Sequence, residues 1–142
     1  MSILVWNPAW ETHLEPVDSQ HRELFRRMEA VAQAIDHSNE ADEIANTIVY
    51  LSGYIDIHFG TEEALMVRSG FPGLEMHRSA HRGLQERVAL LLQELDREEG
   101  ASPDDFLEFL VDWLINHIDT YDRALALHVH RMGPPAPARN EG

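Results

Sequence analysis

Histidines and carboxylates recur in this sequence at the four-residue spacing that places side chains on one face of a helix. In HFGTEEALM, residues 58–66, His58 and Glu62 are four residues apart. HRSAH, residues 77–81, begins and ends with histidine, and NHIDTYD, residues 116–122, follows a histidine with aspartates. Residues four apart on a helix reach toward a common point. Because imidazole and carboxylate groups are ligands of transition-metal ions, the pattern predicts a metal site shared by several helices.

Four amphipathic patterns are expected to form the helices that position these residues. They cover about 18–37, 40–68 and 74–98, and a fourth begins at Ser102. Apolar residues recur along each pattern at steps of three and four. Asp18 or Ser19 is expected to cap the first helix, and Ser102 with Pro103 to open the fourth. Short connections between long amphipathic helices indicate antiparallel neighbours, so the predicted fold is an all-α, up-down-up-down antiparallel four-helix bundle.

One domain is expected over residues 1–132, with an ordered N-terminal arm that packs Trp6 and Trp10 against the bundle. The last ten residues, GPPAPARNEG (133–142), are rich in proline and offer no side chains for a core. We predict that this tail is disordered.

Ligand-type residues fall on the apolar stripe of every expected helix. They are His21, His58, Glu62, His77, His81 and His117. A single histidine on such a stripe is usually a hydrogen-bonded core residue. Several buried imidazoles and a carboxylate without partners would each cost several kcal/mol. A shared metal removes that cost, because it supplies positive charge and the missing bonds.

The position of Asp122 requires a local change in the fourth helix. Asp122 lies five residues after His117, which is about 140° away from the stripe on a regular helix. If Tyr121 faced the core, the later core-facing positions of the helix would include His128. If Asp122 faces the core, the later core-facing positions are all apolar. Those residues are Leu125, Val129 and Met132. We therefore predict a one-residue π-bulge between His117 and Asp122, which brings the carboxylate onto the stripe.

The composition excludes several other chemistries. The 142 residues contain no cysteine and no lysine, so thiolate metal sites, cysteine nucleophiles and Schiff-base lysines are excluded. A net charge of −14 disfavours nucleic acid and anionic membranes as partners. The first residues do not resemble a signal peptide, and no apolar run approaches membrane-spanning length, so we expect a cytoplasmic protein. The apolar stripes are used in the core, which favours a monomer.

The number of candidate ligands indicates two metal ions. Five histidines and two carboxylates are too many for one zinc ion and too rich in nitrogen for calcium or magnesium. Two octahedral iron ions offer about twelve positions. The histidines, two bridging carboxylates and one bridging oxygen leave one position open, which suits a small diatomic ligand.

The sequence resembles the hemerythrins, most closely the bacterial single-domain type, over about residues 5–125. The matching segments are DSQH (18–21), HFGTEEALM (58–66), HRSAH (77–81) and WLINHIDTYD (113–122). The resemblance implies two iron ions with an oxo or hydroxo bridge. It assigns His77, His81 and His117 to one iron, His21 and His58 to the iron with the open position, and Glu62 and Asp122 to both.

The resemblance also implies reversible dioxygen binding for transport, storage or delivery rather than an enzymatic function. Apolar neighbours on the stripes are expected to admit dioxygen and exclude water. They are Phe25, Leu51, Ile55, Leu84, Trp113 and Leu114.

Alternative functions remain open at this point. A ferritin-like oxidase is disfavoured, because no glutamate lies three residues before any histidine. A sensor of oxygen, redox state or nitric oxide, or an iron-handling module, would use the same site. A purely structural bundle would fold without metal. Glu63 is expected to point to the surface, and His128 and His130 to belong to a solvated helix end.

Overall fold

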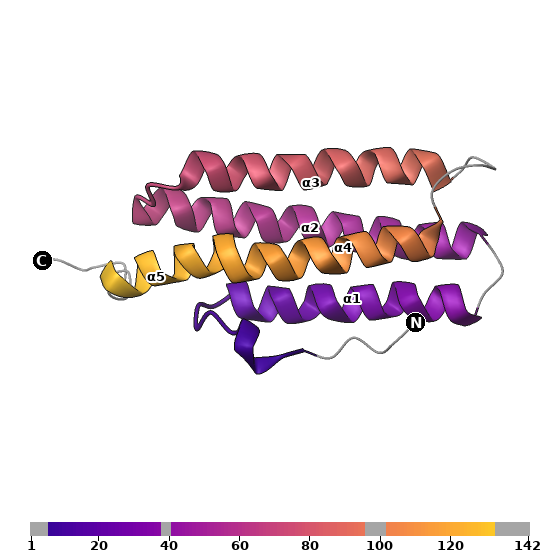
Figure 1. Cartoon of the computed structure of the whole chain (residues 1–142), viewed down its shortest axis with the longest axis horizontal. Helices are drawn as coiled ribbons and strands as arrows, with labels where there is room; N and C mark the ends of the chain where they lie inside the picture. Colours follow the sequence, from indigo (N-terminus) through magenta and orange to yellow (C-terminus); the bar gives the residue numbers. More distant parts are fainter. Residues whose placement is uncertain (1–5, 38–40, 96–101, 133–142) are drawn as a thin grey trace, which may run out of the picture.

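The computed structural model describes residues 6–37, 41–95 and 102–132, and the regular secondary structure in these ranges is entirely helical, without strands. The long helices lie side by side, and α4, η2 and α5 follow one another without a break (Figure 1). The elements are η1 (Pro8–Trp10), α1 (Val17–His37), α2 (Ala41–Ser69), α3 (Leu74–Leu95), α4 (Pro103–His117), the π-helical η2 (Ile118–Asp122) and α5 (Arg123–Met132). The predicted all-α class is confirmed for the described residues.

The start of α4 follows the expected chemistry. The hydroxyl of Ser102 accepts a hydrogen bond from the backbone N–H of Asp105 at 3.0 Å, and Pro103 occupies the first turn. The last predicted residues of the third helix and the predicted disordered tail, residues 133–142, lie outside the described residues.

Asp18 does not cap α1 as predicted, because it lies inside the first turn and holds the N-terminal arm. Its buried carboxylate accepts hydrogen bonds from the Thr12 hydroxyl at 2.7 Å and from the backbone N–H groups of Thr12 and His13. Burial raises the pKa of Asp18, but these hydrogen bonds outweigh burial and hold the pKa below its ordinary value. The arm is therefore fixed to α1 by a buried charge.

The tryptophans of the arm cover the bundle as predicted. Trp6 and Trp10 both contact the ring of Phe25, with ring centroids 5.4 Å and 5.0 Å away. Trp6 also donates a hydrogen bond from its indole nitrogen to Glu11. These contacts bury apolar surface over α1 near His21.

Two buried apolar clusters fill the interior. The larger includes Leu24, Leu51, Phe59, Leu84, Leu114 and Ile118, and the smaller includes Leu14, Val17, Met66, Leu125 and Val129. Along each helix, the ligand-type residues lie between members of these clusters. Apolar side chains therefore flank the ligand-type residues in both directions along the helices. The low dielectric constant of these surroundings strengthens the electrostatic interactions among the ligand-type residues.

The end of α5 differs from two expectations. Met132 is 62% exposed, so Val129 is the last buried residue of this helix. His128 and His130 are not merely solvated, because their Nε2 atoms lie 2.8 Å and 2.9 Å from the carbonyl oxygens of Ser69 and Thr12. Both rings tie α5 to other parts of the chain.

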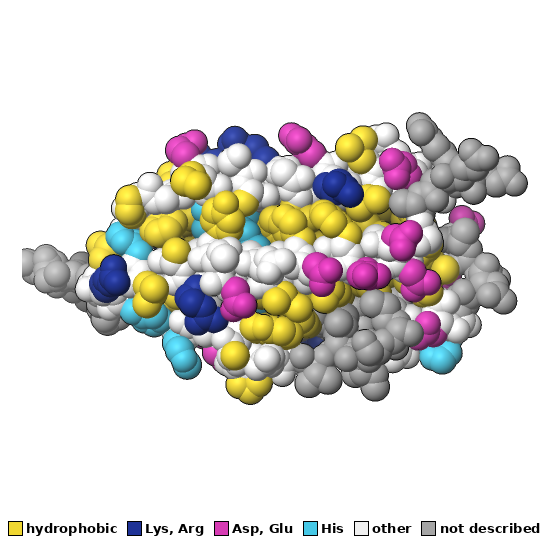
Figure 2. All heavy atoms as spheres, in the orientation of Figure 1, with side chains coloured by type: hydrophobic (Ala, Val, Ile, Leu, Met, Phe, Trp, Pro, Cys, Tyr) yellow, Lys and Arg dark blue, Asp and Glu magenta, His cyan; other side chains and the backbone are white. Residues whose placement is uncertain are grey.

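Acidic side chains lie along the exposed side of α4 (Figure 2). They are Asp104, Asp105, Glu108 and Asp112. Those in the first turn also interact favourably with the helix dipole. No helix among the described residues is long and apolar enough to cross a membrane.

Candidate metal centre

The structure brings all seven predicted ligand residues together in the interior. None has more than 3% of its surface exposed. His21 comes from α1, His58 and Glu62 from α2, His77 and His81 from α3, His117 from the end of α4, and Asp122 from the end of η2. Every long helical segment therefore contributes to one buried polar cluster.

The predicted π-bulge is present and explains the position of Asp122. The backbone over Ile118–Asp122 is π-helical, so five residues cover the rotation that four would cover in a regular helix. Asp122 is 1% exposed, and Leu125 and Val129 beyond it are also buried. The wider turn thus directs Asp122 inward and keeps the apolar face of α5 against the core.

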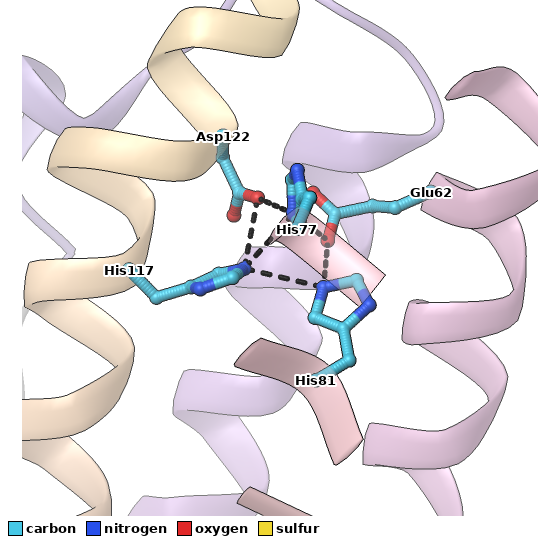
Figure 3. Close-up of side chains that lie close together, drawn as sticks. All are labelled: Glu62, His77, His81, His117 and Asp122. Atoms are coloured by element: carbon cyan, nitrogen blue, oxygen red, sulfur yellow. Dashed lines mark hydrogen bonds and ion pairs between the residues drawn. The ribbon is translucent and has the colours of Figure 1, made fainter. Parts of the chain in front are cut away.

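The first group of ligand atoms converges from α2, α3, α4 and η2 (Figure 3). It consists of Glu62, His77, His81, His117 and Asp122, whose ligand atoms all lie within 4.8 Å of one another. The Nε2 atom of His117 is 3.1 Å from Nε2 of His77 and 3.2 Å from Nε2 of His81. Three imidazole nitrogens that face one point form a site for a transition-metal ion.

A second group lies beside the first and shares both of its carboxylates. It consists of His21, His58, Glu62 and Asp122, again with ligand atoms within 4.8 Å of one another. Asp122 Oδ2 lies 3.0 Å from His21 Nε2, while its Oδ1 lies 3.1 Å from His77 Nε2. Glu62 Oε1 lies 3.1 Å from His81 Nε2 and 3.5 Å from His58 Nε2. Each carboxylate therefore faces both groups.

Several buried polar atoms of the cluster have no hydrogen-bond partner within the described part of the chain. They are both ring nitrogens of His21, Nε2 of His58, Nδ1 of His77 and of His117, Oε2 of Glu62 and both carboxylate oxygens of Asp122. Buried polar atoms are normally paired, and each unpaired one costs about 1–3 kcal/mol. Metal ions bound between the two groups would satisfy the atoms that face them, which are Nε2 of His21 and His58 and the carboxylate oxygens of Glu62 and Asp122, so the residues fit a pair of ions.

The electrostatics of the metal-free site favour the neutral rings of His58 and His81, which are the form that binds metal. Burial, reinforced by neighbouring histidines, lowers the pKa of His58 well below 6.5 and that of His81 to about 2. Burial and the nearby Asp122 raise the pKa of Glu62 well above 4.5. Burial also raises the pKa of Asp122, but the surrounding imidazoles, His117 first, outweigh it and hold that pKa low.

These shifts predict that the metal-free protein loses stability as pH falls below 6.5. The folded-state pKa values of His58 and His81 are depressed, so unfolding lets each ring take up a proton there. The unfolding free energy therefore falls as pH drops below the unfolded-state pKa of histidine. The raised pKa of Glu62 acts in the opposite direction, because the folded state holds its proton more tightly than the unfolded state, but it offsets at most one of the two protons.

Urea unfolding of chelator-treated protein at pH 4.5, 5.5, 6.5 and 7.5 measures this profile. Stability that is unchanged between pH 6.5 and 4.5 contradicts it.

Two side chains outside the predicted ligand set form hydrogen bonds with histidines of the cluster. The Oε1 atom of Gln20 accepts a hydrogen bond from Nδ1 of His58 at 2.8 Å. Glu63, which was expected at the surface, instead accepts one from Nδ1 of His81 at 2.9 Å. The only sequence feature that could have indicated them is their position next to His21 and Glu62. Such partners fix the ring orientation of metal-binding histidines.

Aromatic rings pack against the histidines of the first group. Phe59 stacks on His81 with ring centroids 3.7 Å apart, and Trp113 stacks on His117 at 4.5 Å. Tyr121 covers another side of His117 at 5.1 Å. These contacts limit ring rotation and exclude water from the nitrogens.

Comparisons with known proteins agree with this geometry. The family profile described as Hemerythrin HHE cation binding domain matches residues 12–126. This chain belongs to the hemerythrin family. It is 30% identical over 128 residues to a bacteriohemerythrin of Stenotrophomonas maltophilia, covering 89% of this chain and 81% of that protein. It is 26% identical to a bacteriohemerythrin of Clostridium acetobutylicum, covering 85% and 97%.

Further relatives of this hemerythrin-family protein lie outside bacteria and among solved structures. It is 27% identical to a myohemerythrin of Riftia pachyptila, covering 85% of this chain and 89% of that protein. A crystal structure of wild-type hemerythrin superimposes with a TM-score of 0.81 at 25% identity, covering 90% of this chain and 98% of the other. The predicted family membership is therefore confirmed.

Proposed function

We propose that this protein binds dioxygen reversibly at a non-haem di-iron centre and serves in oxygen transport, storage or delivery. The observation that carries the proposal is the pair of buried ligand groups that share Glu62 and Asp122. Family membership supports iron as the metal. When bound, the iron pair, with its oxo or hydroxo bridge, supplies the electrons and the open position for dioxygen.

In this proposal each residue of the cluster has one task. His77, His81 and His117 would hold one iron, and His21 and His58 would hold the other. Glu62 and Asp122 would be shared by both, which the distances from their oxygens to histidines of both groups support. The second group contains fewer histidines, so it would leave room for dioxygen.

The surroundings of the site support binding rather than catalysis. An apolar cavity of ≈ 10 Å³ lies between α1, α2, α3 and α4, and one of its lining residues, Phe59, stacks on His81. It is lined by Leu24, Met28, Leu51, Ile55, Phe59, Leu84, Leu110 and Leu114. No polar side chain lines it, so an apolar gas is favoured there over water. Exclusion of water and protons favours release of unchanged dioxygen.

The proposal includes the up-down-up-down antiparallel arrangement of the bundle, one domain over residues 1–132, a monomeric state and a cytoplasmic location. The arrangement of the ribbons in Figure 1 supports the first of these. Nucleic acid and membranes are not proposed as partners, in keeping with the net charge of −14. A sensor of oxygen, redox state or nitric oxide, or an iron-handling module, is the alternative function of the same residues.

The visible spectrum of iron-loaded, anaerobically reduced protein tests the proposal. A charge-transfer band is expected to appear with oxygen and to fade when oxygen is purged, over several cycles. A spectrum that passes directly to a stable oxidised form, with no band that purging removes, contradicts reversible binding and favours the alternative. The Asp122→Ala variant is the matched control and should show no band.

A further inference from the structure

The two histidines that are held from outside the cluster have partners of different charge. His58 donates from Nδ1 to the neutral amide of Gln20 at 2.8 Å. His81 donates from Nδ1 to the carboxylate of Glu63 at 2.9 Å. The Nδ1 atoms of His21, His77 and His117 have no hydrogen-bond partner within the described ranges. Among the described residues, the hydrogen bonds to the outer nitrogens of the cluster therefore come from one neutral and one anionic side chain.

The neutral partner is fixed in orientation by its own contacts. The Nε2 atom of Gln20 donates to the hydroxyl of Thr61 at 3.1 Å, and Thr61 donates to the carbonyl of Ile57 at 3.2 Å. The amide oxygen of Gln20 must then face His58. This arrangement makes Gln20 an acceptor that carries no charge.

The anionic partner keeps part of its charge. The second oxygen of Glu63 lies 3.4 Å from Nε of Arg78, and both side chains are about three-quarters buried. Arg78 is also paired with Glu75, which is 80% exposed. One guanidinium thus serves two carboxylates, and the local sum of the three charges is negative. Unlike the amide of Gln20, Glu63 delivers this charge through a hydrogen bond to the ring that holds the metal.

We propose that Glu63 and Gln20 make the two metal positions electronically unequal. Glu63 is a positioning residue that stabilises ferric iron at the position of His77, His81 and His117. A carboxylate that accepts the N–H of a ligand imidazole makes the ring a stronger donor, and its negative charge offsets the extra positive charge of the oxidised ion. Gln20 supplies orientation without charge at the other position, which therefore favours the ferrous state. This inference rests on the di-iron site proposed above.

Two isosteric substitutions test the inference, because each changes one charge and retains an acceptor. They are Glu63→Gln and Gln20→Glu in the full-length, iron-loaded protein. Each variant and the wild-type protein are compared in a redox titration with a mediator dye. One electron passes between the dye and each iron, and the ferric-to-ferrous ratio is measured at a fixed potential. We expect Glu63→Gln to lower this ratio about tenfold, equivalent to 59 mV, and Gln20→Glu to raise it by a similar factor.

Glu75→Gln is the matched control. This substitution removes the charge of another carboxylate that pairs with Arg78, but it breaks no hydrogen bond to a histidine of the cluster. Because Glu75 is exposed, we expect the ferric-to-ferrous ratio to change by less than about twofold. An equal shift in Glu75→Gln and Glu63→Gln would show a general field effect and overturn the assignment to Glu63.

The proposed function and this inference fail in different ways. If wild-type protein takes up no iron or shows no band that purging removes, the proposed function fails before any variant is compared. If wild-type protein passes and Glu63→Gln retains both irons with an unchanged ratio, the inference is wrong. If Glu63→Gln does not fold or does not retain iron, Gln20→Glu decides, and an unchanged ratio in that variant overturns the inference.

Discussion

Replacing either shared carboxylate is expected to remove both metal ions, whereas replacing a histidine of the second group alone removes one. Glu62 and Asp122 occur in both ligand groups, and His21 occurs only in the second. Asp122→Ala or Glu62→Ala should reduce bound iron from about two ions per chain to less than a tenth of that, because each remaining group loses the ligand that joins it to its neighbour. His21→Ala leaves the five residues of the first group intact and should retain about one ion.

Iron content measured by mass spectrometry after desalting distinguishes these outcomes. His128→Ala is the control, since its ring contacts the carbonyl of Ser69 away from the cluster and should leave iron content unchanged. Far-UV circular dichroism of each variant separates loss of metal from loss of fold. Wild-type iron content in Asp122→Ala or Glu62→Ala would show that these carboxylates are not shared ligands.

The sequence predicted the interior of this protein better than the contacts around it. Periodicity placed the helices, and the same stripes selected six of the seven residues that converge, all but Asp122. The π-helical turn followed from register alone, because only a count from Asp122 continued into apolar positions. These features are local, so the spacing of residues along a single helix is enough to predict them.

Contacts that depend on how helices pack were not predictable in the same way. Glu63 lies one residue from the inward stripe, and whether it faces solvent or His81 depends on how closely α3 packs beside it. His130 reaches the carbonyl of Thr12 from 118 residues away. The local pattern around Asp18 predicts a helix cap, but its actual role depends on an arm that folds back over α1. Each case requires tertiary geometry that a single-helix pattern does not contain.

Removing the metal from the wild-type protein is expected to lower its stability strongly without abolishing the fold. A ligand at a thousand times its dissociation constant stabilises the folded state by about 4 kcal/mol. For a domain of this size, that corresponds to a fall in Tm of roughly 8–16 °C on chelation. The two apolar clusters contain no residue of the metal site, so they should keep the helices formed in the metal-free state.

Differential scanning calorimetry before and after treatment with a strong chelator measures the shift. Asp122→Ala provides the matched control, because a chain that binds no iron should show no change on chelation. A wild-type Tm that is insensitive to chelation would mean that the buried imidazoles and carboxylates are stable without metal. The cluster would then be a structural hydrogen-bonded core, despite the unpaired atoms of His21, Glu62 and Asp122. A large shift in wild-type protein alone would show that metal ions satisfy those atoms, as their burial and charge require.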